Sequence, residues 1–374
     1  MTSLGPPPPG LELVAHLALP QLCGQLLYVG FQGKTLPEPL AQAIEAGLRG
    51  GVVLFSRNCS GLEQTWRLCR AIASVAPADM PALIAVDEEG GRVSRMPEGV
   101  VKLPSMRRLG NVGDPGRCYR AAALLARQLS AIGVSCDFAP VLDVDASPDG
   151  SIIGDRSFSG DPHRAAQLAL AFARGLEDSG IVPCGKHFPG HGGTVLDSHR
   201  VLPRLDVSRS ALDTRELVPF REAVAAKIPA LMTAHVVYRT FDPELPATLN
   251  PQICRELLRA EMGFAGVLFS DDLEMRALSD RGSIEENSVA AIRAGCDGLL
   301  ICSQQDLADR ALEALVSTAE QDPEFSAVVE RSAIRLLGMR RRFPSRPALS
   351  LTDLQQIIAR DQEVAEILAD FEVE

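Results

Sequence analysis

Two residues whose types and spacing suit acid–base catalysis are a carboxylate and a histidine two positions apart, Asp197 and His199. A carboxylate at this separation can accept the imidazole Nδ1–H, fix the tautomer and stabilise the imidazolium. Pro189 and three glycines within residues 190–193 come shortly before the pair, which predicts a mobile loop over a pocket. His199 is therefore a candidate general acid and base that works near neutral pH.

A second candidate is Asp271, whose carboxylate stands at the end of the apolar run 266–271. At a strand end its side chain would project into the mouth of a pocket, where it could act as a nucleophile. The neighbouring Asp272 would point away or cap the following turn. Other charged residues stand at the ends of apolar runs or in the loop after one. They suit a ligand dense in hydroxyls, because each hydroxyl can both donate and accept. These residues are Asp87, Arg156, Lys186 and His187.

Eight short apolar runs predict the strands that must position these residues. Each run is apolar on both faces, as parallel strands covered by helices are. The predicted strands are 25–31, 51–56, 82–87, 134–143, 181–187, 228–236, 266–271 and 297–302. Helical patterns alternate with them at 36–49, 61–75, 116–132, 162–179, 209–226, 250–262, 284–294 and 304–320.

This alternation predicts an α/β fold of the (β/α)8 TIM-barrel type. A doubly wound open sheet is the alternative, but it favours a glycine-rich phosphate turn early in the chain, and neither GxGxxG after a strand nor GxxxxGK[ST] occurs. In a barrel the C-terminal ends of the strands share one face. Five of the predicted strands end in, or are followed by, ionisable residues, so these residues would meet on that face; the strands are 82–87, 134–143, 181–187, 228–236 and 266–271. One polar strand end is ordinary loop composition, whereas five together indicate an active site.

The polar strand ends lie in motifs that resemble glycoside hydrolase family 3, specifically its single-domain β-N-acetylglucosaminidases of peptidoglycan recycling. The motifs appear in the family's order across roughly residues 20–340. They are VDEEGGRVSR (86–95), FAPVLDVD (138–145), GDRSFS (154–159), KHFPGHG (186–192), DSH (197–199), MTAHV (232–236) and FSDDLEM (269–275).

The resemblance implies a retaining exo-β-N-acetylglucosaminidase, without cofactor or metal, that releases N-acetylglucosamine from muropeptide fragments. It implies that Asp271 is the nucleophile of a covalent glycosyl-enzyme intermediate and that His199 and Asp197 form the acid/base dyad. A histidine would then replace one of the two carboxylates, ~5–5.5 Å apart, that retaining glycosidases usually use. The residues that it implies for binding N-acetylglucosamine are Asp87, Arg95, Arg156, Lys186 and His187.

Three alternatives remain open at this point. A neutral acid/base does not repel phosphate as a carboxylate would, so phosphate instead of water could attack the intermediate, as in a phosphorylase. A zinc hydrolase could use His187, His191, His199 and His235, although the first two straddle Pro-Gly and do not share a helix face. The third is a sugar-binding barrel without catalysis, which loss of Asp271 or His199 would have signalled.

The composition favours a globular cytoplasmic protein. The net charge of −11 over 374 residues argues against nucleic acid or an anionic membrane as a partner. The nine cysteines form no CxxC motif, which is typical of thiols in a reducing compartment. The N-terminus has no basic n-region and no apolar stretch reaches ~18 residues, so we expect neither a signal peptide nor a membrane span.

The chain is expected to divide into a catalytic barrel, residues 1–345, and an acidic amphipathic helical tail, residues 346–374. Residues 351–374 carry seven acidic residues and one arginine, and their apolar stripe is expected to dock on a barrel. We expect a monomer or a weak dimer. Without the tail the barrel is only mildly acidic, and Arg95, Arg156 and Lys186 are expected to give it a mouth that tolerates the carboxylates of a muropeptide. The quoted site residues bear only on the N-acetylglucosamine part of the ligand, and the aglycone stays open.

Overall fold

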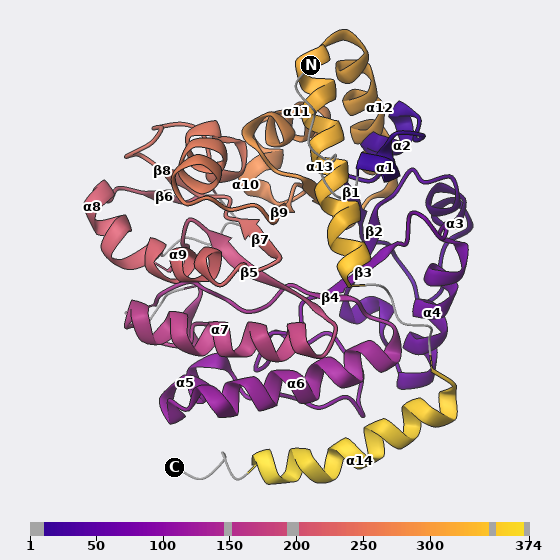
Figure 1. Cartoon of the computed structure of the whole chain (residues 1–374), viewed down its shortest axis with the longest axis vertical. Helices are drawn as coiled ribbons and strands as arrows, with labels where there is room; N and C mark the ends of the chain where they lie inside the picture. Colours follow the sequence, from indigo (N-terminus) through magenta and orange to yellow (C-terminus); the bar gives the residue numbers. More distant parts are fainter. Residues whose placement is uncertain (1–10, 146–151, 193–201, 344–348, 370–374) are drawn as a thin grey trace, which may run out of the picture.

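The fold is a closed barrel of eight parallel strands surrounded by helices (Figure 1). The computed structural model describes residues 11–145, 152–192, 202–343 and 349–369. Around the barrel the strands follow the order β1-β10-β9-β7-β5-β4-β3-β2. They are β1 (Leu27–Val29), β2 (Gly51–Leu54), β3 (Leu83–Val86), β4 (Cys136–Asp137), β5 (Val182–Phe188), β7 (Ala230–Thr233), β9 (Val267–Asp272) and β10 (Gly298–Ile301).

Each of the eight predicted runs contains one barrel strand or most of one, so the predicted (β/α)8 fold is confirmed. The largest difference is at β4, where only two residues of the predicted run 134–143 form a regular ladder. Pro140 lies within this run and has no amide hydrogen to continue a ladder. The pairing resumes one residue later as a single bridge between Val141 and Lys186.

Two long helices of the barrel wall, α6 and α7, begin where the sequence offers a capping side chain followed by proline. Asp114 accepts a hydrogen bond from Gly116 N at the start of α6 (Pro115–Ile132), and Asp161 accepts one from Arg164 N at the start of α7 (Pro162–Asp178). The other helices of the barrel wall are α3 (Glu38–Glu45), α4 (Leu62–Val75), α9 (Leu217–Ala225), the π-type η5 (Gln252–Glu261), α11 (Ile284–Ala294) and α12 (Gln305–Gln321).

The helix α13 (Pro323–Arg342) packs against α2 (Leu19–Gly24) and α12 near the N-terminal ends of the strands. Its Arg340 is buried there and donates to the carbonyls of Gly50 at 2.7 Å and Pro81 at 3.1 Å, just before β2 and β3. These bonds tie α13 to the barrel.

The tail helix α14 (Leu351–Ala369) lies alongside α6, at the bottom of the view in Figure 1. Leu354 and Ile358 are buried, and Asp361 accepts a hydrogen bond from Arg127 of α6 at 2.9 Å. In addition, the indole N–H of Trp66 donates to the carbonyl of Leu349 at 3.0 Å. The described first part of the apolar stripe, through Ile358, thus packs on the barrel of its own chain.

Some elements have no counterpart in the sequence prediction. A two-stranded parallel sheet joins β6 (Arg204–Leu205) to β8 (Val237–Tyr238), and the helix α5 (Met106–Val112) precedes α6. The hydroxyl of Tyr238 also donates to the carbonyl of Gly190 at 2.5 Å. The segment Val237–Tyr238 therefore holds the chain on both sides of residues 193–201. Within the described ranges, no helix has the length and apolarity needed to cross a membrane.

Candidate active site

A cavity of about 310 Å³ opens at the C-terminal ends of the barrel strands. Every predicted site residue that the structure describes lines this cavity. These residues are Asp87, Arg95, Arg156, Lys186, His187 and Asp271. Asp197 and His199 fall outside the described residues, so their predicted roles remain predictions.

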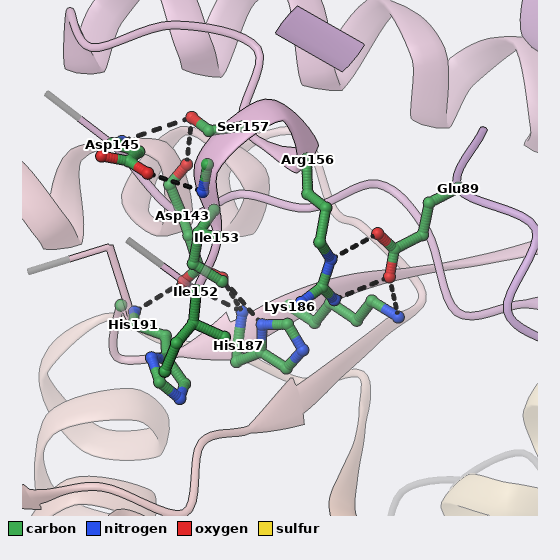
Figure 2. Close-up of polar contacts among 12 residues, drawn as sticks. Glu89, Asp143, Asp145, Ile152, Ile153, Arg156, Ser157, Lys186, His187 and His191 are labelled. Carbon is green, nitrogen blue, oxygen red and sulfur yellow. Dashed lines mark hydrogen bonds and ion pairs between the residues drawn. The ribbon is translucent and has the colours of Figure 1, made fainter. Parts of the chain in front are cut away.

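Glu89 is the centre of the charged network in the cavity wall, as Figure 2 shows. Its two carboxylate oxygens accept from Arg156 Nε at 2.7 Å and from the terminal guanidinium nitrogen at 2.8 Å, a bidentate pair. Lys186 Nζ lies 2.6 Å from Glu89 Oε1 and 2.6 Å from Asp87 Oδ1. Glu89 thus fixes two cations that come from different loops and strands of the barrel.

Strong pairing explains the ionisation of this network. Burial alone would raise the pKa of the Glu89 carboxyl, but Arg156 and Lys186 hold the pKa well below its usual range. Burial would lower the pKa of the Lys186 ammonium, but Asp87 and Glu89 raise it above its usual range. Glu89, Arg156 and Lys186 are therefore charged at neutral pH.

The same pairing bears on the expected tolerance of the mouth for carboxylates. Arg95, Arg156 and Lys186 were expected to provide it, but Arg156 and Lys186 are each paired with buried or partly buried carboxylates. The charge of isolated side chains therefore does not show that the pocket favours anionic ligands.

Asp143 positions His187 in β5 and His191 just after it (Figure 2). Its carboxylate lies 2.7 Å from His187 Nδ1 and accepts from the backbone amide of His191 at 2.6 Å. Burial would raise the pKa of the Asp143 carboxyl, but His187 lowers it, so Asp143 is ionised. Burial lowers the pKa of His191 to about 4, so His191 is neutral near pH 7.

Arg95 is presented to the cavity by a loop that Glu88 holds. The buried Glu88 carboxylate accepts from the backbone amides of Arg95 at 2.6 Å and Met96 at 2.9 Å. The Arg95 Nε is buried and has no hydrogen-bond partner within the described part of the chain. A buried donor without a partner is costly, so a ligand oxygen would be a favourable partner here.

Asp271 ends β9 and faces the cavity. Its Oδ1 accepts from the Asp272 backbone amide at 2.8 Å. Burial would raise the pKa of the Asp271 carboxyl, but His235 and His187 bring it below its usual value. Asp271 is therefore an ionised carboxylate with one oxygen held by the backbone.

The neighbouring Asp272 caps the next turn, as the sequence suggested. Its Oδ1 accepts from the amides of Glu274 at 3.1 Å and Cys302 at 3.3 Å. Burial raises the pKa of Asp272 to about 7, in contrast to Asp271. Two adjacent carboxyls thus differ in ionisation because only one of them has nearby imidazoles as its main partners.

Sequence reasoning assigned no role to Glu89 or Asp143. Both stand in the motifs already quoted, VDEEGG and VLDVD. The alternation of side chains along a strand does not predict which of several neighbouring acidic residues at its end points toward the cavity. Among the described residues, no three His, Cys, Asp or Glu side chains are grouped so that they could hold a metal ion.

An ionised carboxylate that faces a hydroxyl-binding network across a small cavity, at the C-terminal end of a (β/α)8 barrel, is an arrangement typical of glycosidases. The comparison with known families agrees. Residues 19–337 match the model of the glycosyl hydrolase family 3 N-terminal domain, and the chain belongs to that family.

Curated relatives define its activity more closely. A β-hexosaminidase of Alkalilimnicola ehrlichii is 39% identical over 318 residues, which span 83% of this chain and 88% of that protein. A β-hexosaminidase of Pseudomonas aeruginosa is 42% identical over 267 residues, 71% of this chain and 79% of that protein. The protein is accordingly a glycosidase, a β-N-acetylhexosaminidase.

Solved structures show the same fold. A β-N-acetylhexosaminidase of Beutenbergia cavernae superposes with a TM-score of 0.81 at 30% identity, covering 87% of this chain and 98% of that chain. NagZ of Neisseria gonorrhoeae, solved in complex with N-trifluoroacetyl-D-glucosamine, superposes with a TM-score of 0.70 at 34% identity, covering 84% and 97%.

Proposed function

We propose that this β-N-acetylglucosaminidase retains configuration and acts from the non-reducing end through a covalent glycosyl-Asp271 intermediate. The observation that carries the proposal is the state of Asp271. Its carboxylate is ionised, one oxygen is tied to the Asp272 amide, and the side chain faces a cavity walled by charged donors and acceptors. A fixed, ionised carboxylate is what a nucleophile for an anomeric carbon requires.

In the first step the Asp271 carboxylate attacks the anomeric carbon, and the glycosidic C–O bond breaks as His199 gives its proton to the leaving oxygen. In the second step water attacks the same carbon, the Asp271–sugar bond breaks, and the proton of the water passes to His199. The proposed partner Asp197 keeps the imidazole in the required tautomer and stabilises its protonated form. A histidine suits both roles because its ordinary pKa of ~6.5 lies near neutral pH.

The sugar hydroxyls are bound by Asp87, Arg95, Arg156, Lys186 and His187 in this proposal. The hydrogen bonds of Glu89 to two of them and of Asp143 to a third keep their side chains in place before the ligand arrives. The complex of the Neisseria gonorrhoeae relative with N-trifluoroacetyl-D-glucosamine supports an N-acylated glucosamine as the sugar in this pocket.

The proposed substrate is a peptidoglycan fragment, N-acetylglucosamine linked β-1,4 to 1,6-anhydro-N-acetylmuramic acid, with or without peptide. The support for this aglycone is the resemblance to the recycling enzymes. A cytoplasmic location is part of the same proposal, and it is supported by the nine cysteines, all of which are buried free thiols.

The test is product analysis by mass spectrometry with purified muropeptides, in buffers with and without inorganic phosphate. Free N-acetylglucosamine and the matching anhydromuramyl product in both buffers would support the proposal. N-acetylglucosamine 1-phosphate as the main product in phosphate would show the phosphorylase alternative. Cleavage of 4-nitrophenyl N-acetylglucosaminide without cleavage of muropeptides would agree with the proposed reaction and refute the proposed aglycone.

A further inference from the structure

We propose that His235 is a positioning residue that holds the Asp271 nucleophile in its attacking orientation, acting through the backbone of Asp272. The inference rests on the proposed role of Asp271. His235 follows β7, is fully buried and is not among the cavity-lining residues. It therefore acts on the reaction through its neighbours and not through contact with the sugar.

The hydrogen bonds of His235 define what it does. Its Nε2 lies 2.9 Å from the backbone carbonyl oxygen of Asp272, and its Nδ1 lies 2.7 Å from the hydroxyl oxygen of Thr248. A carbonyl can only accept, so Nε2 carries a proton and donates. In the neutral ring the Thr248 hydroxyl donates to Nδ1; in the imidazolium Nδ1 donates to the hydroxyl, which can then turn to the Ala234 carbonyl at 3.2 Å. The bond to Asp272 is present in both states.

Thr248 is itself held in place. It belongs to the short helix η4 (Ala247–Leu249), is fully buried, and its hydroxyl lies 2.8 Å from that of Thr233 on β7. The His235 ring is thus held at both nitrogens, by the buried Thr248 hydroxyl and by the Asp272 carbonyl. A buried polar chain of this kind orients its last member, here the Asp272 carbonyl.

Asp272 transmits this orientation to the nucleophile. Its backbone amide donates to Asp271 Oδ1 at 2.8 Å, while its carbonyl accepts from His235 and its carboxyl accepts from the amide of Cys302 on the other side. The direction of the amide depends on how residue 272 is held, because its carbonyl and amide share one Cα. Asp272 is also paired with Leu300 of β10, so loss of the His235 bond would remove one of several restraints and would shift the nucleophile by a fraction of an ångström.

The experiment compares His235→Ala with His235→Gln, using 4-nitrophenyl β-N-acetylglucosaminide. With this substrate kcat/KM reports the attack by Asp271, and it does not depend on the peptidoglycan aglycone. We expect kcat/KM of His235→Ala to fall on the order of a hundredfold, the size of effect that a small misplacement of reacting groups produces. The side-chain amide of Gln places a donor near the position of the imidazole Nε2, so His235→Gln should recover most of the loss.

The inhibition constant of N-acetylglucosamine distinguishes a misplaced nucleophile from a disturbed sugar-binding pocket. The described sugar-binding residues stand on other strands and loops, so His235→Ala should change this constant little. Thr248→Val should give a smaller loss of kcat/KM than His235→Ala. Thr65→Val is the matched control, because Thr65 is an equally buried threonine of α4 whose hydroxyl donates to the Gly61 carbonyl and which does not line the cavity. This variant should leave kcat/KM unchanged.

Three results would overturn the inference: full kcat/KM in His235→Ala, an equal loss in His235→Gln and His235→Ala, or an inhibition constant that weakens in proportion to kcat/KM. Asp271→Ala is assayed in parallel. An active Asp271→Ala enzyme would refute the proposed nucleophile itself, whereas an inactive one beside fully active His235 variants would refute only the role of His235.

Discussion

The ammonium nitrogen of Lys186 lies 2.6 Å from Glu89 Oε1, and Glu89 is only 1% exposed. The same carboxylate binds Arg156 through both oxygens. Two of the proposed sugar-binding side chains therefore depend on an acidic residue whose carboxylate is almost fully enclosed. Glu89 organises the pocket before any ligand is present, and its removal would leave two buried cations short of a partner.

Replacement of Glu89 by Gln should destabilise the fold by about 3 kcal/mol, because removal of one partner from a buried ion cluster leaves the other charges uncompensated. Affinity for N-acetylglucosamine should fall as well, since Arg156 and Lys186 lose their common anchor. Urea unfolding followed by the fluorescence of Trp66, the single tryptophan, measures the first effect. Glu63→Gln is a control at an exposed ion pair, and it should cost well under 1 kcal/mol. An equal change in the two variants would contradict the role of Glu89.

Acid should weaken the fold through the same residue. The pKa of Glu89 is lower in the folded than in the unfolded protein, so its stabilisation is fully present above the unfolded value of ~4.3 and is lost as the pH falls below it toward the folded pKa. The difference in unfolding free energy between the wild type and Glu89→Gln should therefore be constant above pH ~5 and shrink below pH ~4. Urea titrations at several pH values measure this difference in unfolding free energy. If the difference grows on acidification, the pKa of Glu89 is not lowered by folding.

Asp271→Ala should abolish turnover, with a loss of at least on the order of a thousandfold in kcat, because no other group replaces the covalent step. Asp272→Asn is the neighbouring control and should retain far more activity, since Asn can still accept the two backbone amides. Steady-state assays with 4-nitrophenyl β-N-acetylglucosaminide measure both. Trapping of a glycosyl group on a residue other than Asp271, located by peptide mass spectrometry, would contradict the assignment.

His199→Ala should affect substrates according to their leaving group. A general acid contributes ~10²–10⁴-fold when the leaving oxygen needs a proton, and little when an activated aryl oxygen can leave as an anion. The loss of kcat/KM should therefore be large with a natural disaccharide and small with a 2,4-dinitrophenyl glycoside. Equal losses with the two substrates would refute the acid role, while leaving the nucleophile in place.

Deletion of residues 346–374 should leave kcat/KM on the aryl substrate nearly unchanged, because the barrel and its cavity are formed by earlier residues. The unfolding free energy should fall by about 3 kcal/mol as the buried Leu354 and Ile358 are lost. The emission of Trp66 should also shift, since its indole N–H loses the Leu349 carbonyl. Leu354→Ala is the point-mutant control, and loss of activity in the shortened chain would show that the boundary is wrong.

Local patterns in the sequence were enough to predict the barrel and to place most of the pocket. Apolar runs such as 51–56 and 82–87 each contain a strand because a parallel strand buried on both faces needs continuous apolar residues. The C-terminal ends of parallel strands meet on one face of a barrel, so residues as distant as Asp87 and Asp271 could be assigned to one site.

Only the tertiary structure decided which polar groups bind one another. Lys186 could be expected near the sugar from its place after a strand, but its bonds to Asp87 and Glu89 join residues that are far apart in the sequence. The same holds for the chain from Thr248 through His235 to Asp272. The type of a residue determines whether its side chain can donate or accept. Its partner is the group that comes within a hydrogen-bond length of about 3 Å when the barrel closes. The sequence therefore determined the fold and the class of ligand, and the closed barrel determined which charged groups pair with one another.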